Sequence, residues 1–163
     1  MKKSIFALVF VVFACALSAC AHLPYGPSDD PTDAAFVRAV QVVVDNGEDL
    51  KFVDKVYWFP KMAAPSMGPY GIYGTIVVTD KNLYVLGWNR NTNAFDVQYK
   101  QPVTDIVNAE HITSIYGPGD YISVESKNKR FDLYTVFAMF AADDMIEKNR
   151  ELLGCLTALK IAN

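Results

Sequence analysis

The chain has 163 residues, of which 52% are hydrophobic and 20% are charged, and its formal net charge is −3. A chain of this length is sufficient for one domain with a core of its own. The slightly acidic charge and the lack of a basic stripe argue against a nucleic-acid-binding protein, and also against electrostatic attraction to an anionic membrane.

The N-terminal residues have the layout of a secretory signal peptide. Lys2 and Lys3 come first, an apolar run follows over residues 5–17, and small residues close it. This run is shorter than the roughly 20 residues that a membrane-spanning helix needs. We therefore predict that residues 1–19 are a signal peptide.

The apolar run ends in Leu17-Ser18-Ala19-Cys20, which resembles the lipobox of bacterial lipoproteins at every position. The resemblance implies cleavage before Cys20 and acylation of that cysteine, with palmitate-type chains holding the mature protein on the membrane. With no aspartate after the cysteine, it also implies the outer membrane, facing the periplasm. Two alternatives stay open, namely an ordinary cleaved signal with an incidental cysteine, and acylation at Cys15.

The mature chain is expected to be one domain on a short tether. Removal of the signal peptide would leave 144 residues and a formal net charge of −5, because 13 basic residues would face 18 acidic ones. Residues 20–32 include three prolines and few core-forming residues, so they are predicted to be the lipidated tether. Residues 33–163 are then a single domain.

The first element of the domain is predicted to be a short helix over residues 33–45. Thr32 or Asp33 is a suitable N-cap, and Asn46-Gly47 is a suitable stop. Apolar residues follow at helical spacing, namely Phe36, Val40 and Val43.

Aromatic, β-branched and alternating patterns then predict a series of short strands. The predicted strands cover residues 51–60, 74–79, 83–88, 95–99, 121–126 and 131–137. Between them, residues 103–116 have a mixed pattern, in which the expected inward positions are Val103, Ile106, Ile112 and Ile115.

The chain closes with a predicted amphipathic helix that begins near Asp143 and Asp144, where carboxylates favour the helix N-terminus. Its apolar stripe consists of Met145, Ile146, Leu152, Leu153, Leu156 and Leu159. About seven short strands followed by one such helix is an α+β pattern, and it predicts a small antiparallel barrel whose open end the helix covers.

Four segments carry a family resemblance. They are the run from Gly74 to Leu86, residues 103–106, the hairpin over residues 121–137 and the C-terminal helix from Asp143. Together they are similar to the PH-like superfold, nearest the bacterial PH and GRAM-type domains. The resemblance covers roughly residues 48–161. It implies a fold and not an activity. Lipid-binding members carry a basic cluster in the first hairpin loop, whereas residues 61–71 here hold only Lys61, so phosphoinositide-type binding is not expected.

The sequence offers little for catalysis. His22 lies in the tether and His111 in the mixed segment, without a nucleophile elbow, a phosphate loop or metal-ligand spacing around either. Cys155 has no disulfide partner if Cys20 is acylated, and its apolar surroundings indicate a small buried hydrophobe. We expect no enzyme activity, no metal and no cofactor. A hydrolase would need His111 beside a Ser, Thr or Asp.

Two groups of residues are candidates for contacts with a partner. The first is apolar or aromatic, in a loop rich in glycine and proline, and consists of Met67, Tyr70 and Tyr73. The second is the basic cluster Lys127, Lys129 and Arg130. Structural alternatives exist for both, because the loop would also suit packing on the barrel mouth and the cluster would suit a solvated hairpin turn.

The sequence thus predicts a non-enzymatic, membrane-anchored lipoprotein of the bacterial cell envelope that acts as a binding or scaffolding module, with an envelope protein as partner and no nucleic acid. One mode of binding is the addition of an extended peptide to a sheet edge. The alternative is a carrier of a small apolar ligand or lipid inside the barrel.

Overall fold

The computed structural model describes residues 25–45, 47–60, 72–113, 120–127, 131–136 and 142–162. Helices and strands follow in the order α2 (Ala34–Gln41), β1 (Leu50–Pro60), β2 (Ile72–Thr79), β3 (Asn82–Asn89), β4 (Ala94–Pro102), the 3₁₀ turn η1 (Val103–Asp105), β5 (Ile106–Thr113), β6 (Asp120–Ser126), β7 (Phe131–Val136) and α3 (Ala142–Ala162).

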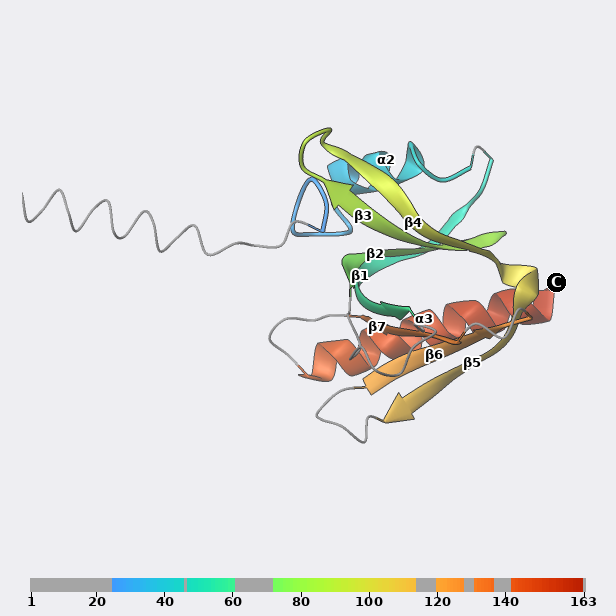
Figure 1. The fold of residues 1–163 in the computed structure, drawn as a ribbon. Helices are drawn as coiled ribbons and strands as arrows, with labels where there is room; N and C mark the ends of the chain where they lie inside the picture. The colour runs from blue at the N-terminus through green and yellow to red at the C-terminus, as the bar shows by residue number, and fades with distance from the viewer. Residues whose placement is uncertain are drawn as a thin grey trace, which may run out of the picture.

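The strands form one antiparallel sheet in the order β4-β3-β2-β1-β7-β6-β5 (Figure 1). The sheet bends at β1, which pairs with β2 over Leu50–Trp58 and with β7 over Val56–Pro60. In consequence β2–β4 lie on one side of the molecule, and β5–β7 lie on the other beside α3 (Figure 1).

The predicted strands are present in the described ranges. Residues 106–113 of the mixed segment form a full strand after the η1 turn, and the predicted inward positions Val103 and Ile106 are buried. Closure into a barrel is not shown, because β4 and β5 stand at opposite ends of the strand order and no ladder pairs them within the described ranges.

The main core lies between the two parts of the sheet and α3. Alternate residues of each strand point into it, as expected for a period of two. From β1 these are Val56 and Trp58, and from α3 they are Leu152 and Leu156. The other buried members are Ile76, Val78, Leu83, Val85, Ile106, Ile122 and Val124.

A second core covers the opposite face of β2–β4, where α2 packs. Asp33 caps this helix as predicted, because its Oδ1 accepts the Ala35 N–H at 2.7 Å. The helix ends at Gln41, earlier than predicted, and the β-branched residues that follow it explain the difference. The buried members of this core are Phe36, Val40, Val44, Val77, Tyr84, Leu86 and Phe95.

The packed part of the chain begins upstream of the predicted domain start at residue 33. Tyr25 is only 6% exposed, and its carbonyl oxygen accepts a hydrogen bond from Thr75 Oγ1 at 2.8 Å. Gly26 lies so close to the Phe36 ring that a Cβ there would sit 2.3 Å from its Cε2 atom. Part of the segment predicted to be tether therefore belongs to the domain.

Candidate binding groove

A groove with a volume of about 210 Å³ lies between the first half of α3 and the strands β5 and β6. Its walls are mostly apolar, with an imidazole, an amide and a guanidinium among them. The lining residues are His111 from β5, Ile122 from β6, and Ile146, Asn149, Arg150 and Leu153 from α3.

The groove exists because α3 is fixed at two places. Leu152 and Leu156 are buried in the main core, and near the far end of the helix Lys160 Nζ donates a hydrogen bond to the carbonyl oxygen of Val107. Successive residues of a helix point about 100° apart. Leu153 therefore faces the groove when its neighbour Leu152 faces the core.

The rim of the groove is accessible. Ile146 is 39% exposed on α3, and His111 is exposed on β5. Asn149, by contrast, is 1% exposed. This arrangement has the chemistry of a recognition pocket, because an apolar side chain would be covered while polar groups at the rim fix its direction.

The strand beside the groove is an end strand of the sheet. In the described part of the chain, β5 pairs only with β6. The register shifts between Ile106 and Asn108, and Val107 in between is 46% exposed. An end strand presents backbone N–H and C=O groups along its outer edge, which an extended peptide can pair with.

An ion pair between a buried carboxylate on β1 and a partly exposed lysine on α3 lies behind this surface. Asp54 is 6% exposed and accepts the Lys55 N–H at 2.7 Å, and its Oδ2 lies 3.5 Å from Lys148 Nζ. Burial raises the pKa of Asp54 against the opposing effect of these partners. Lys148 also contacts Glu151 at 3.2 Å. The pair fixes the first half of α3, and thus one wall of the groove.

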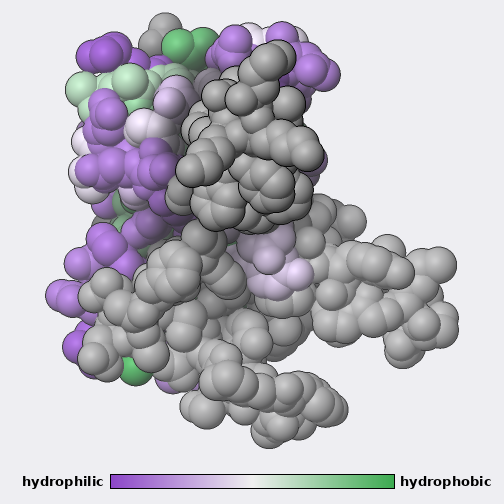
Figure 2. Space-filling view, turned by 90° about the vertical axis from the view of Figure 1, so that its left-hand side faces the viewer, coloured by the Kyte–Doolittle hydropathy of each residue, from purple (hydrophilic) through white to green (hydrophobic). Residues whose placement is uncertain are grey.

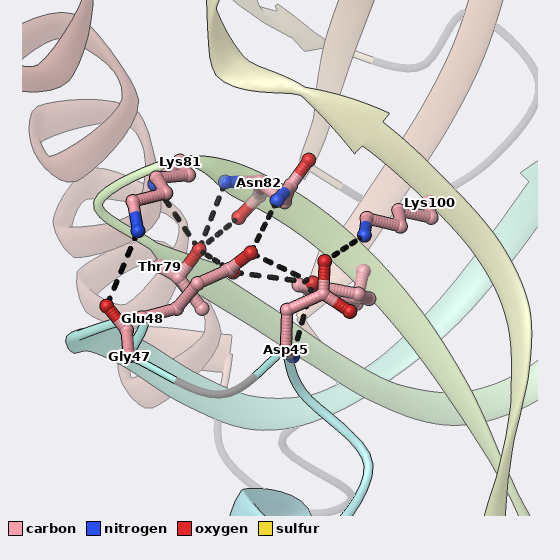
Figure 3. A network of polar contacts seen from close by, with 8 residues as sticks. Asp45, Gly47, Glu48, Thr79, Lys81, Asn82 and Lys100 are labelled. Atoms are coloured by element: carbon pink, nitrogen blue, oxygen red, sulfur yellow. Dashed lines mark hydrogen bonds and ion pairs between the residues drawn. The ribbon is translucent and has the colours of Figure 1, made fainter.

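A separate polar network joins the segment before β1 to the turn between β2 and β3 (Figure 3). The carboxylate of Glu48 accepts from Thr79 Oγ1 at 2.6 Å, from Asn82 Nδ2 at 2.6 Å and from the Tyr84 hydroxyl at 3.1 Å. Lys100 pairs with Asp45 and lies over the Tyr84 ring. The polar groups of this network satisfy one another's hydrogen-bonding needs. We therefore assign the network to the stability of the fold.

The structure places Tyr73, a predicted contact residue, on β2 in a cluster of tyrosines. Its ring centroid lies 4.5 Å from that of Tyr57 and 6.0 Å from that of Tyr25. Tyr73 is 42% exposed, and Lys55 Nζ lies 5.5 Å from the centre of the Tyr25 ring. The cluster is on the outer side of β1 and β2, away from the main core.

Lys127 from the predicted basic cluster forms contacts with Asp105 within the domain. Its Nζ lies 3.3 Å from Asp105 Oδ1, and its backbone N–H donates to the Asp105 carbonyl oxygen at 2.8 Å. The remaining predicted site residues lie outside the described residues, namely Cys20, Met67, Tyr70, Lys129 and Arg130.

Neither His111 nor Cys155 lies in a described catalytic arrangement. The lining of the groove at His111 includes no Ser, Thr or Asp among the residues that the structure describes. Burial raises the pKa of the Cys155 thiol, which disfavours the reactive thiolate. No cluster of metal-ligating side chains occurs within the described ranges. Among the helices described there, none has both the length and the apolar character to cross a membrane.

The sequence analysis missed the groove, although it had identified two of its residues. Ile146 and Leu153 belong to the predicted apolar stripe of α3, but they were expected to cover the barrel. Arg150 lies on the polar side of that helix. The width of the predicted apolar stripe of α3 was a signal for the groove. The stripe is wider than one buried contact surface on a helix, so the residues at its margin must face another surface.

Comparison with protein-family models and with curated protein sequences finds no match. Solved structures do match the fold. The hSac2 domain from the human phosphoinositide phosphatase Sac2 aligns with a TM-score of 0.54 at 12% identity, over 77% of this chain and 79% of that chain. A structure of the linker and DH/PH domains of a RhoGEF aligns with a TM-score of 0.51 at 9% identity, over 84% of this chain.

A structure of Vav1 with an allosteric inhibitor also aligns, with a TM-score of 0.51 at 7% identity over 76% of this chain. The alignments span only 35% of the RhoGEF chain and 31% of the Vav1 chain. At these identities the likeness concerns the fold alone. The chain therefore has a PH-like fold, as the resemblance of its strands implied.

Proposed function

We propose that this chain is a non-enzymatic lipoprotein of the bacterial cell envelope, anchored through acyl chains on Cys20, whose domain binds another envelope protein. The lipobox-like sequence supports the anchor and the location. The Cys20→Ser variant described below tests both. We also propose that the domain is a barrel of the bacterial PH or GRAM type, whose sheet curves round the main core while the outer edge of β5 stays unpaired. The η1 turn, which leads from the end of β4 to the start of β5, supports that curvature.

The observation that carries the binding proposal is the apolar groove beside the outer edge of β5. An extended peptide that pairs with an end strand gains backbone hydrogen bonds, and a neighbouring pocket selects one of its side chains. Here Ile122, Ile146 and Leu153 would accept an apolar side chain. Arg150 and His111 would stand near the peptide backbone or a polar neighbour.

Site-specific photocrosslinking in intact cells tests this proposal. A photoreactive amino acid at Ile146, in the groove, should yield a discrete crosslinked protein partner. The matched control is Val42 at the end of α2, which is 85% exposed and lies outside the groove. A partner captured at both positions, or at Val42 alone, would contradict the groove as the binding site.

A specific observation favours the carrier as a second candidate. The indole Nε1 of Trp58 is buried in the main core and has no hydrogen-bond partner among the described residues. Such a donor would suit a polar atom on a bound ligand. Native mass spectrometry of the purified domain distinguishes the two functions, because a stoichiometric extra mass supports a carrier and a bare chain supports the binding module.

A further inference from the structure

We infer that the outer side of β1 and β2 around Tyr25 lies against the membrane, because a very short tether holds it there. The inference rests on the proposed acylation of Cys20. Beyond the proposed function, it specifies which face of the domain the membrane covers. The remaining surfaces stay accessible to a protein partner.

The length of the tether is set by where the packed chain begins. Only four residues separate Cys20 from Tyr25. Five Cα-to-Cα steps span at most about 18 Å when fully extended. A domain of this size has a radius of gyration of about 14 Å and is thus roughly 35 Å across. The side of the domain opposite Tyr25 is therefore out of reach of the membrane surface.

Tyr25 is firmly attached to the domain, so the tether does not lengthen by release of the following residues. Its carbonyl oxygen accepts a hydrogen bond from the Thr75 hydroxyl, and the residue is buried. Gly26 fits against the fully buried Phe36 ring in a space that admits no Cβ. These contacts fix the position on the domain surface at which the tether is attached.

The surface around this point suits the membrane interface. Tyr73 is 42% exposed next to Tyr57, and tyrosines favour the zone between headgroups and acyl chains. Charge does not drive the contact, because Asp29 and Asp30 are both exposed on this segment, and the charge of Asp30 interacts with that of Lys55. The described surface on this side is mostly hydrophilic (Figure 2). We therefore assign the orientation to the tether, with the tyrosines as interfacial contacts.

The far end of the molecule provides a matched reference position. Residues 25–33 lie on the left in Figure 1, whereas α3 ends on the right. Ala158 is exposed near that end of the helix. A probe at Tyr73 should meet the membrane, and a probe at Ala158 should not.

Fluorescence quenching by the membrane tests the orientation. Full-length lipoproteins carrying Tyr73→Cys or Ala158→Cys, each with Cys155→Ala, are labelled with an environment-sensitive dye. They are placed in phosphatidylethanolamine–phosphatidylglycerol vesicles that contain a lipid with a spin-labelled headgroup. We expect loss of fluorescence at residue 73 and none at residue 158, independent of salt concentration. Equal quenching at both positions, or stronger quenching at 158, overturns the inference.

Mass measurement of the same samples separates this inference from the proposed function. If Cys20 carries no acyl chains, both the anchor and the orientation fail. If it is acylated and quenching shows no preference for residue 73, only the orientation fails.

A spacer variant tests whether the tether is the cause. Insertion of 40 Gly and Ser residues between Pro24 and Tyr25 gives a linker of about 35 Å root-mean-square length, comparable with the domain. The preference for residue 73 should then disappear while acylation and folding remain. If the preference persists, the tether does not set the orientation.

Discussion

Asp54 carries a carboxylate among the inward-facing residues of β1, a position that otherwise favours apolar side chains. Its neighbours along the same face are Val56 and Trp58, both in the main core. Transfer of a carboxylate from water is unfavourable even when it is paired. Lys148 and the Lys55 N–H offset only part of that cost, so the pKa of Asp54 remains raised.

Asp54→Asn should therefore stabilise the protein at neutral pH. A carboxyl whose pKa is raised in the folded state contributes its stability below its ordinary pKa of 3.8, and that contribution is lost as the pH rises through the folded-state value. The variant should unfold at higher denaturant concentration than the parent at pH 7, and the difference should vanish near pH 3.

Asp49→Asn is the control for this experiment, because the side chain of Asp49 is 81% exposed. It should leave the denaturation midpoint unchanged at both pH values. If Asp54→Asn instead lowers the midpoint at pH 7, the ion pair with Lys148 is a net stabilising interaction and the argument from burial is wrong.

Gly26 is a second residue whose role depends on its immediate contacts. In Gly26→Ala the added Cβ would overlap the Phe36 ring, which is fully buried. We expect a loss of about 1–3 kcal/mol in the free energy of unfolding.

Gly154→Ala is the matched control, since nothing lies within 4 Å of a Cβ in that exposed helical position. It should add roughly 0.5–1 kcal/mol. Urea titration measures both, and an unchanged Gly26→Ala midpoint would contradict the packing of this segment.

At the scale of elements, the Glu48 network fastens the segment between α2 and β1 to the β2–β3 turn. Thr79 and Asn82, which donate to Glu48, are themselves buried. Removal of the carboxylate would leave the Asn82 amide and the Tyr84 hydroxyl without their acceptor, whereas Thr79 Oγ1 keeps its contact with the Asn82 carbonyl oxygen. The network thereby holds α2 over its face of the sheet.

Glu48→Ala should reduce the free energy of unfolding by about 3 kcal/mol, the cost of leaving buried polar groups without a charged acceptor. Lys81→Ala is the control, because Lys81 is exposed, its side chain donates to the Gly47 carbonyl oxygen, and its backbone N–H, which donates to Thr79 Oγ1, is kept in the variant. Its effect should be below about 0.5 kcal/mol. Equal midpoints for the two variants in chemical denaturation would show that the network contributes little.

At the scale of the whole molecule, the proposed acylation of Cys20 would decide where the protein is. Cys20→Ser should abolish incorporation of labelled fatty acid and release the protein from the membrane fraction, because two or more acyl chains form the stable anchor. Cys15→Ser is the control and should keep both the label and the membrane association. Persistent labelling of Cys20→Ser, with loss in Cys15→Ser, would move the anchor to the rival cysteine.

The anchor and the groove together define how the proposed module would work. The tether would hold the tyrosine cluster at the membrane surface. The far end of α3 would then face the periplasm. The anchor that limits the rotation of the domain would also keep it close to the bilayer surface. Its partners would then be restricted to proteins that reach this region.

The fold was largely predictable from local patterns. Alternation and turn residues placed the strands, and Asp33 marked the start of α2, because these signals depend only on neighbouring residues. The end of α2 and the strand over residues 106–113 were not predicted correctly. In both places the local preference is weak, and pairing or packing with distant segments decides the outcome.

The sequence by itself determined the expected signal peptide, the strand series and the amphipathic closing helix, since periodicity and short motifs are local properties. Only the tertiary structure decided the groove, the Asp54–Lys148 pair and the attachment of Tyr25. Each of these depends on residues that are far apart in the chain and meet only after folding, such as Tyr25 and Thr75. No spacing in the sequence records which side of a helix faces the core and which side borders an open strand.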